Sequence, residues 1–152
     1  MSEILVENIM TEKVTVAGSQ HTFSQVLEFF NKFNIHHIPV MKDDKIIGII
    51  SETDVMKHLS DRLLAGETIN LEQLNEKISI EQLMTPSPVT ILPETSLEEA
   101  LQLIYSDGFH ALPVLDKSGA LRGIVSSNDL LHTFYREMRP PSYDISSPGF
   151  GI

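Results

Sequence analysis

Two short segments of this chain carry the same polar side chains at the same spacing. Each reads Gly-apolar-x-Ser-x-x-Asp, from Gly48 to Asp54 and again from Gly123 to Asp129. A serine between a strand and a helix can cap the helix, and an aspartate three residues later can complete a capping box. The same geometry suits a ligand, because a helix start favours phosphate and a carboxylate one turn in can accept from both ribose hydroxyls. Both interpretations use the same side chains, and the presence of two copies favours ligand binding.

The two motifs belong to a longer internal repeat. Residues 36–40 read His-His-Ile-Pro-Val, and residues 110–114 read His-Ala-Leu-Pro-Val, 74 positions further on. Met10 and Met84 have the same offset of 74, and the motif glycines are 75 positions apart. A nearly constant offset over so many positions indicates a duplicated unit. We therefore expect any site in one copy to have a counterpart in the other.

The hydrophobic pattern predicts strand, helix, strand, strand, helix in each copy. In the first copy these elements are the strand 14–16, the helix 22–33, the strands 38–41 and 45–50, and a helix beginning at Ser51. In the second copy they are the strand 89–91, a helix beginning at Ser96, the strands 112–115 and 120–126, and the helix 128–138. A polar turn joins the paired strands in each copy, and the second turn is one residue longer.

Local chemistry marks several boundaries of these elements. Thr22 with Gln25 predicts a capping box at the start of the first copy's first helix, and the pair Ser96 and Glu99 predicts the same in the second copy. The proline of each Pro-Val segment lacks an amide proton, so it is expected at a sheet edge or a strand start. Thr11 and Thr85, which follow the paired methionines, either begin a turn or contact a ligand.

The chain divides into four parts on this interpretation. They are repeat 1 (1–64), a polar linker with one short helix (65–80), repeat 2 (81–138) and a flexible tail rich in proline, glycine and serine (139–152). A unit of this size buries little surface alone. Two units packed face to face would share one core and form a pseudo-two-fold cleft with similar walls.

Composition excludes several classes of function. The formal charge is −10, from 21 acidic and 11 basic residues, which argues against nucleic acid or an anionic membrane as the main partner. The absence of cysteine removes disulfides, thiolate nucleophiles and cysteine-based zinc sites. No apolar run approaches the roughly 18–20 residues of a membrane span, and the first residues lack the pattern of a signal peptide. A cytoplasmic protein is expected.

The order and duplication of these motifs resemble a pair of CBS domains, named after cystathionine β-synthase and also called a Bateman module. The matching pieces are residues 8–11 (Asn-Ile-Met-Thr), residues 82–85 (Gln-Leu-Met-Thr), both His-x-apolar-Pro-Val segments and both serine–aspartate motifs. The resemblance covers roughly Val6 to Met138. It implies an α/β (α+β) fold of two tandem β-α-β-β-α units, packed sheet to sheet with pseudo-two-fold symmetry.

The resemblance also implies a function. Clefts of this family commonly hold adenosine derivatives, so we expect a non-catalytic regulatory module that binds AMP, ADP or ATP, with S-adenosylmethionine less favoured, and that requires no cofactor. It is expected to form a homodimer through its helices and to signal to an enzyme or transporter. The alternative is a dimerisation or docking module without a nucleotide. An enzyme is the least expected class, since no Walker loop, GxGxxG segment or nucleophile–base arrangement is present.

The same resemblance assigns roles within the cleft. The motif aspartate holds the ribose, the motif serine lies near the phosphate, and the residues before each Pro-Val strand line the wall. A site in such pairs mixes both repeats, which places Asp54 with Phe109 and His110, and Asp129 with Ile35 and His36. The full set of nucleotide-binding candidates is Thr15, Ile35, His36, His37, Ile49, Ser51, Thr53, Asp54, Thr90, Phe109, His110, Ala111, Ile124, Ser126, Asn128 and Asp129.

The charge of this cleft differs from the family pattern. Many members place arginine or lysine near the phosphates, whereas this chain offers His36, His37 and His110, which are only partly charged near neutrality. Arg122 and Lys45 precede the two motif glycines. A monophosphate or a nucleoside therefore needs less positive charge from this cleft than a polyphosphate does. A metal site is not expected, because neighbouring histidines on a strand point to opposite faces.

Overall fold

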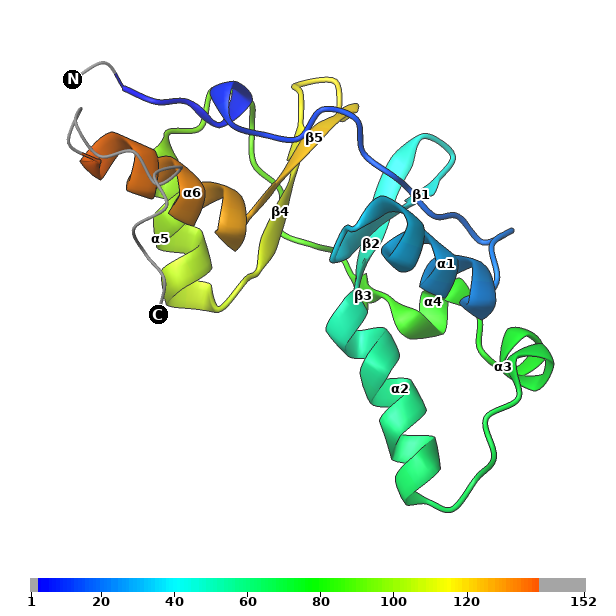
Figure 1. Ribbon diagram of the computed structural model, residues 1–152. Helices are drawn as coiled ribbons and strands as arrows, with labels where there is room; N and C mark the ends of the chain where they lie inside the picture. Colours follow the sequence, from blue (N-terminus) through cyan, green and yellow to red (C-terminus); the bar gives the residue numbers. More distant parts are fainter. Residues whose placement is uncertain (1–2, 140–152) are drawn as a thin grey trace, which may run out of the picture.

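The computed structural model describes residues 3–139 and contains two halves of similar construction (Figure 1). The first half contains α1 (Phe23–Phe33), β1 (His37–Lys42), β2 (Lys45–Ser51) and α2 (Glu52–Leu64). The second contains α5 (Leu97–Asp107), β4 (Ala111–Leu115), β5 (Leu121–Ser126) and α6 (Ser127–Met138). A short 3₁₀ helix (Val6–Asn8) precedes both, and α3 (Leu71–Lys77), α4 (Ile80–Leu83) and β3 (Thr85–Pro86) lie between them. The predicted α/β fold class is confirmed.

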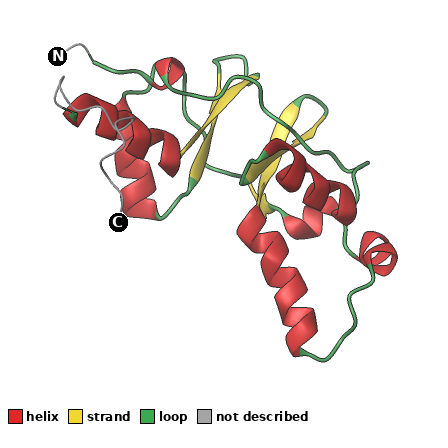
Figure 2. Cartoon of the chain, viewed as in Figure 1, coloured by secondary structure: helices red, strands yellow, loops and turns green. Residues whose placement is uncertain are grey.

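The strands lie in the middle of the molecule and the helices lie outside them (Figure 2). One sheet has the order β1-β2-β3 and the other consists of β4 and β5, with every pair antiparallel. None of the helices between residues 3 and 139 has the length and apolar content needed to cross a membrane. The α3 helix falls in the predicted linker, while the predicted tail, beyond Arg139, lies outside the described residues.

The predicted helix starts are confirmed by their hydrogen bonds. The side chain of Thr22 accepts from the amide of Gln25, whose own side chain accepts from the amide of Thr22. Ser96 and Glu99 form the same reciprocal pair at the start of α5. Such caps depend only on residues three apart, so local sequence is enough to predict them.

The predicted strands 14–16 and 89–91 are wrong, because only a single parallel bridge forms in each region, at Ala17 and at Ile91. Ala17 donates to the carbonyl of Pro39 at 2.9 Å and accepts from the amide of Met41 at 2.8 Å. The next bond of a parallel ladder would need an amide proton on Pro39, which proline lacks. Ile91 makes the equivalent pair of bonds, because it donates to the carbonyl of Pro113 and accepts from the amide of Leu115. Pro113 also lacks an amide proton, so this ladder stops there as well. Both prolines therefore lie on a sheet edge, as predicted.

The segments that precede the two halves are exchanged between their cores. Val6 comes before the first half, yet it is fully buried in the core of the second half, with Ile9 and Met10 packed against the same cluster. Ile80 and Leu83 come before the second half and are buried in the core of the first. Each half is therefore completed by residues that precede the other half in the chain.

Backbone pairing continues this exchange. Thr11 and Ile124 exchange two backbone hydrogen bonds, of 2.9 and 3.0 Å, at the edge of the second sheet. Thr85 pairs with Ile49, so β3 forms the third strand of the first sheet. The backbones of both threonines thus extend the sheet of the opposite half, which gives these residues a structural role.

The glycine of each serine–aspartate motif makes room for the crossing segment. A Cβ atom at Gly123 would lie 2.7 Å from the sulfur of Met10 and 2.8 Å from the carbonyl oxygen of Thr11. A Cβ atom at Gly48 would meet three side-chain atoms of Met84. The near-equal offsets of the glycines and the methionines along the chain therefore reflect two equivalent contacts.

We expect Gly123→Ala to destabilise the protein more than Gly48→Ala. The first substitution forces a backbone carbonyl to move, whereas the second is opposed by a flexible methionine side chain. Overpacking of this kind costs about 1–3 kcal/mol. Thermal unfolding of both variants would measure the difference, and equal losses would show that the backbone of Thr11 yields as easily as the side chain of Met84.

Candidate functional site

Each serine–aspartate motif lies where a strand passes directly into a helix. Ser51 ends β2 and its side-chain oxygen accepts from the amide of Asp54 at 3.0 Å. Ser126 ends β5 and accepts in the same way from the amide of Asp129 at 3.2 Å. The predicted capping role of both serines is confirmed.

The residue before each Pro-Val strand is tied to the following helix start. The carbonyl of His36 accepts from the amide of Glu52, and the carbonyl of His110 accepts from the amide of Ser127, both at 2.9 Å. These bonds fix the predicted wall residues beside the motif of their own half. They also occupy one amide in the first turn of each helix, so part of the helix start that could bind phosphate already has a partner.

Histidines from both halves gather near the start of α2. His36 Nδ1 lies 2.7 Å from Glu52 Oε2 in an exposed contact. Burial lowers the pKa of His37 below its ordinary value of 6.5, and the positive charges of His110 and His36 lower it further, while Asp54 opposes the shift. His110 belongs to the second half and the other three residues belong to the first. The structure therefore brings His110 of the second half close to His37 of the first.

The two motif aspartates differ in how they are bonded. The carboxylate of Asp129 accepts from the amide of Ser126 at 2.8 Å and from its hydroxyl at 2.9 Å, which completes a capping box. No hydrogen bond from residues 3–139 reaches the carboxylate of Asp54, so only half of the box forms there. The carboxylate of Asp54 therefore retains its capacity to accept hydrogen bonds from a ligand.

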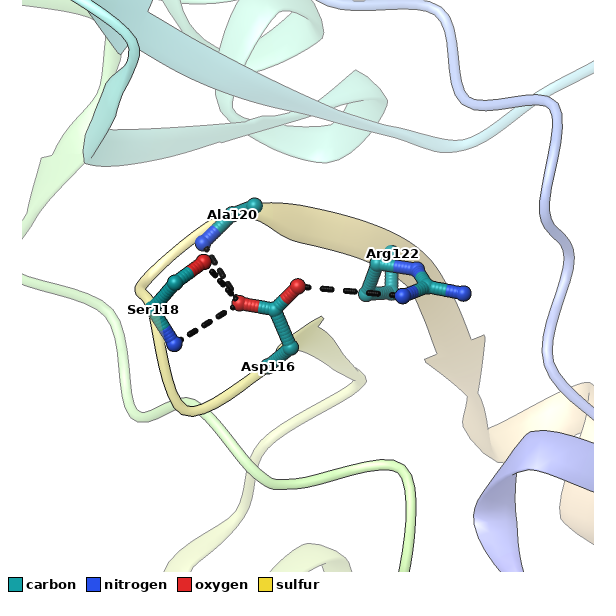
Figure 3. A network of polar contacts seen from close by, with 4 residues as sticks. All are labelled: Asp116, Ser118, Ala120 and Arg122. Carbon is teal, nitrogen blue, oxygen red and sulfur yellow. Dashed lines mark hydrogen bonds and ion pairs between the residues drawn. The ribbon is translucent and has the colours of Figure 1, made fainter.

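The two basic residues beside the motif glycines lie toward the hairpin turns. Figure 3 shows Arg122 directed at Asp116, with Nη1 3.7 Å from Oδ2. The other oxygen of Asp116 accepts from the amide and hydroxyl of Ser118 and from the amide of Ala120. These contacts, the Ser118 hydroxyl foremost, lower the pKa of Asp116. Lys45 lines a cavity of about 500 Å³ together with residues of both turns.

The remaining candidates are dispersed around the two motifs. Ile35 and Phe109 pack against the cores of their own halves. Ala111 is buried, Thr15 is half-buried, and Thr53 and Asn128 are exposed. Thr90 lines a separate cavity of about 620 Å³ whose lining includes neither Ser126 nor Asp129.

Sequence reasoning missed one side chain of this region. Glu52, the first residue of α2, contacts His36, and its counterpart in the second half is Ser127. The signal was a carboxylate inside one copy of the motif that the other copy lacks. Across residues 3–139 the structure contains no group of three His, Asp or Glu side chains arranged to hold a metal ion.

The free energy of unfolding is expected to decrease as the pH falls below 6.5, in part because of His37. The unfolded chain binds a proton at the ordinary pKa of this histidine, whereas the folded protein resists protonation. The contribution is therefore complete above pH 6.5 and is lost on acidification. Urea unfolding at about pH 7.5 and about pH 5.5 should show a smaller decrease for His37→Gln than for the unaltered protein. Equal decreases in the free energy of unfolding for the two proteins would show that His37 does not contribute to the pH dependence.

Comparison with known proteins identifies both halves. The family model described as "CBS domain" matches residues 6–61 and again residues 80–136. A CBS domain-containing protein of Dictyostelium discoideum is 30% identical over 142 residues, which cover 91% of this chain and 96% of that protein. A homoserine O-acetyltransferase of Methanococcus vannielii is 29% identical over 134 residues, but this chain spans only 25% of that enzyme.

Solved structures show the same fold. CBSX2 of Arabidopsis thaliana in complex with AMP has a TM-score of 0.71 at 24% identity, covering 89% of this chain and 98% of that one. A CBS domain pair in complex with 5′-methylthioadenosine and S-adenosyl-L-methionine has a TM-score of 0.74 at 24% identity, covering 89% and 98%. At these identities the likeness establishes the architecture of paired repeats.

Proposed function

The chain belongs to the CBS domain family, and from this premise we propose that it is a non-catalytic regulatory module that binds an adenosine nucleotide between its two repeats. Structural relatives that bind AMP, or 5′-methylthioadenosine and S-adenosyl-L-methionine, support this class of ligand. The binding event would bias the arrangement of the module and so alter its contact with a partner protein. A ligand can do this only if its affinity differs between two arrangements.

The observation that carries this proposal is the chemistry around Asp54. Its carboxylate accepts no hydrogen bond from the described part of the chain. It lies at the start of α2, where His37 and the second half's His110 are close enough for their charges to interact. A ribose presents two hydroxyl donors to a carboxylate, and a phosphate can accept a hydrogen bond from the N–H group of an imidazole. The ribose of a nucleotide is thus matched by the carboxylate of Asp54, and its phosphate is matched by the nearby imidazoles.

Among adenosine nucleotides, AMP is the best match for this charge distribution. The nearby cation candidates are histidines, which are only partly charged near neutral pH. Arg122 is directed toward Asp116 in its own hairpin. A triphosphate carries more negative charge than partly protonated histidines can balance, so the affinity should decrease from AMP to ATP.

Calorimetric titration of the purified protein with AMP, ADP, ATP and S-adenosylmethionine tests the proposal. We expect AMP to bind with a dissociation constant in the micromolar range and ATP to bind more weakly. If none of the four ligands binds below millimolar concentration, the nucleotide role is wrong and the docking alternative remains.

We also propose that the module self-associates through its helices. Large apolar side chains are exposed on them: Leu64 in α2 is 87% exposed, Tyr105 in α5 is 88% exposed, and Leu131 in α6 is 69% exposed. Burying such side chains at an interface is favourable. Light scattering coupled to size exclusion should report a dimer that Leu131→Glu weakens. A monomer at high concentration would contradict this part of the proposal.

A further inference from the structure

We propose that the two motif aspartates have different roles, so that the module binds one nucleotide per chain, at Asp54, while Asp129 serves as a helix cap. This inference rests on the proposed function and deepens it. The two motifs share the same sequence pattern, and the hydrogen bonds of their aspartates distinguish them.

Asp129 already has the partners that a ribose would supply. The amide and the hydroxyl of Ser126 both donate to its Oδ2 atom, at 2.8 and 2.9 Å. A ribose hydroxyl bound there would have to displace these two donors, because they hold the carboxylate turned back toward the helix start. Breaking such a cap lowers ligand affinity by about 3- to 30-fold relative to an aspartate that is free.

A difference in the neighbouring strand accompanies the different hydrogen bonds of the two aspartates. His37 begins β1, and its imidazole interacts electrostatically with Asp54. The corresponding residue at the start of β4 is the buried alanine Ala111, which offers Asp129 no such group. The carboxylate of Asp54 thus has an imidazole nearby and accepts nothing from Ser51, whereas the carboxylate of Asp129 accepts from the amide and the hydroxyl of Ser126.

The first half also has a carboxylate that the second lacks. Glu52 follows Ser51, and its Oε2 atom lies 2.7 Å from Nδ1 of His36, the residue before the Pro-Val strand of the same half. Its counterpart, Ser127, cannot make an equivalent ion pair. The start of α2 therefore combines a free carboxylate acceptor, Asp54, with the contact between Glu52 and His36, and the start of α6 has neither feature.

Two alanine variants form a matched pair that tests this division. Asp54→Ala and Asp129→Ala occupy the same position in their helices, so both lose the same interaction with the helix dipole. Only Asp129→Ala also loses a complete capping box. We expect its thermal midpoint to lie about 2–6 °C below that of Asp54→Ala. Calorimetry with AMP should give one site per chain, both in the unaltered protein and in Asp129→Ala.

The outcomes separate this inference from the function on which it rests. Two AMP sites of equal affinity, or loss of AMP binding in Asp129→Ala, would overturn the inference and leave nucleotide binding established. Equal thermal midpoints for the two variants would also overturn it, whatever the ligand. A failure of AMP, ADP, ATP and S-adenosylmethionine to bind would contradict the proposed function, and the single-site inference would fail with it.

Discussion

Asp54→Ala is expected to weaken the binding of AMP by about 100-fold or more. A carboxylate that accepts hydrogen bonds from both ribose hydroxyls makes two charge-assisted contacts, each contributing about 1.5–3 kcal/mol. The carboxylate of Asp54 has no hydrogen-bond donor within residues 3–139, so it is free to make both contacts. Calorimetric titration of the variant with AMP would measure the loss.

A second ligand identifies the group that Asp54 recognises. AMP that lacks both ribose hydroxyls should bind the unaltered protein weakly, and Asp54→Ala should change its affinity little. The four measurements form a thermodynamic cycle whose coupling energy reports the contact between the carboxylate and the hydroxyls. A loss of equal size for both ligands would mean that Asp54 acts on some other part of the nucleotide.

The folded state should survive this substitution. Asp54 contributes its backbone amide to the Ser51 cap, and that amide remains in the alanine variant. Circular dichroism and the thermal midpoint of Asp54→Ala would verify that the loss of affinity reflects the missing carboxylate. Ser51→Ala would be a poor control, because it removes the cap itself.

Local signals in the sequence predicted most of the fold. The capping boxes at Thr22 and Ser96, the two hairpins and the order of elements depend on residues close together in the chain. Residues 14–16 and 89–91 consist of β-branched side chains, which favour a strand, yet neither segment forms one. The missing amide of Pro39 could have corrected the prediction at 14–16, since a strand beside β1 would need that donor.

The exchange of segments between the halves could not be predicted from local patterns. The apolar residues around Val6 and Ile80 indicate that they are buried, but hydrophobicity does not say which core receives them. Only the position of the crossing backbone, which pairs Thr11 with Ile124 and Thr85 with Ile49, decides the assignment.

In the candidate site, the positions of the motif residues could be predicted from the sequence, but their hydrogen bonds could not. The repeat predicted both motif aspartates at helix starts, and the structure has them there. The residues paired with the two motif serines also differ, since His37 pairs with Ser51 and Ala111 pairs with Ser126. That pair of residues already differed in the sequence, but the hydrogen bonds of the aspartates required the fold.

Ile80→Ala is expected to cost about 2–5 kcal/mol of unfolding free energy and to loosen the first half more than the second. Ile80 lies within the second family match, at residues 80–136, yet it is 1% exposed within the core built around α1, β1 and β2. Val6→Ala should have the reverse effect, because Val6 lies in the first match and is fully buried in the second core. Urea unfolding would measure both losses.

Native-state hydrogen exchange would show which half each substitution opens. In Ile80→Ala, the amides of β1 and β2 should lose more protection than those of β4 and β5, and in Val6→Ala the order should reverse. A loss confined to β4 and β5 in Ile80→Ala would mean that each segment stabilises the half it precedes, and the exchange would be wrong. If the reversal is observed, each half is stabilised by residues that precede the other half in the chain. The two halves would then be energetically coupled, and coupling of this kind could carry an effect of nucleotide binding at Asp54 to the second half.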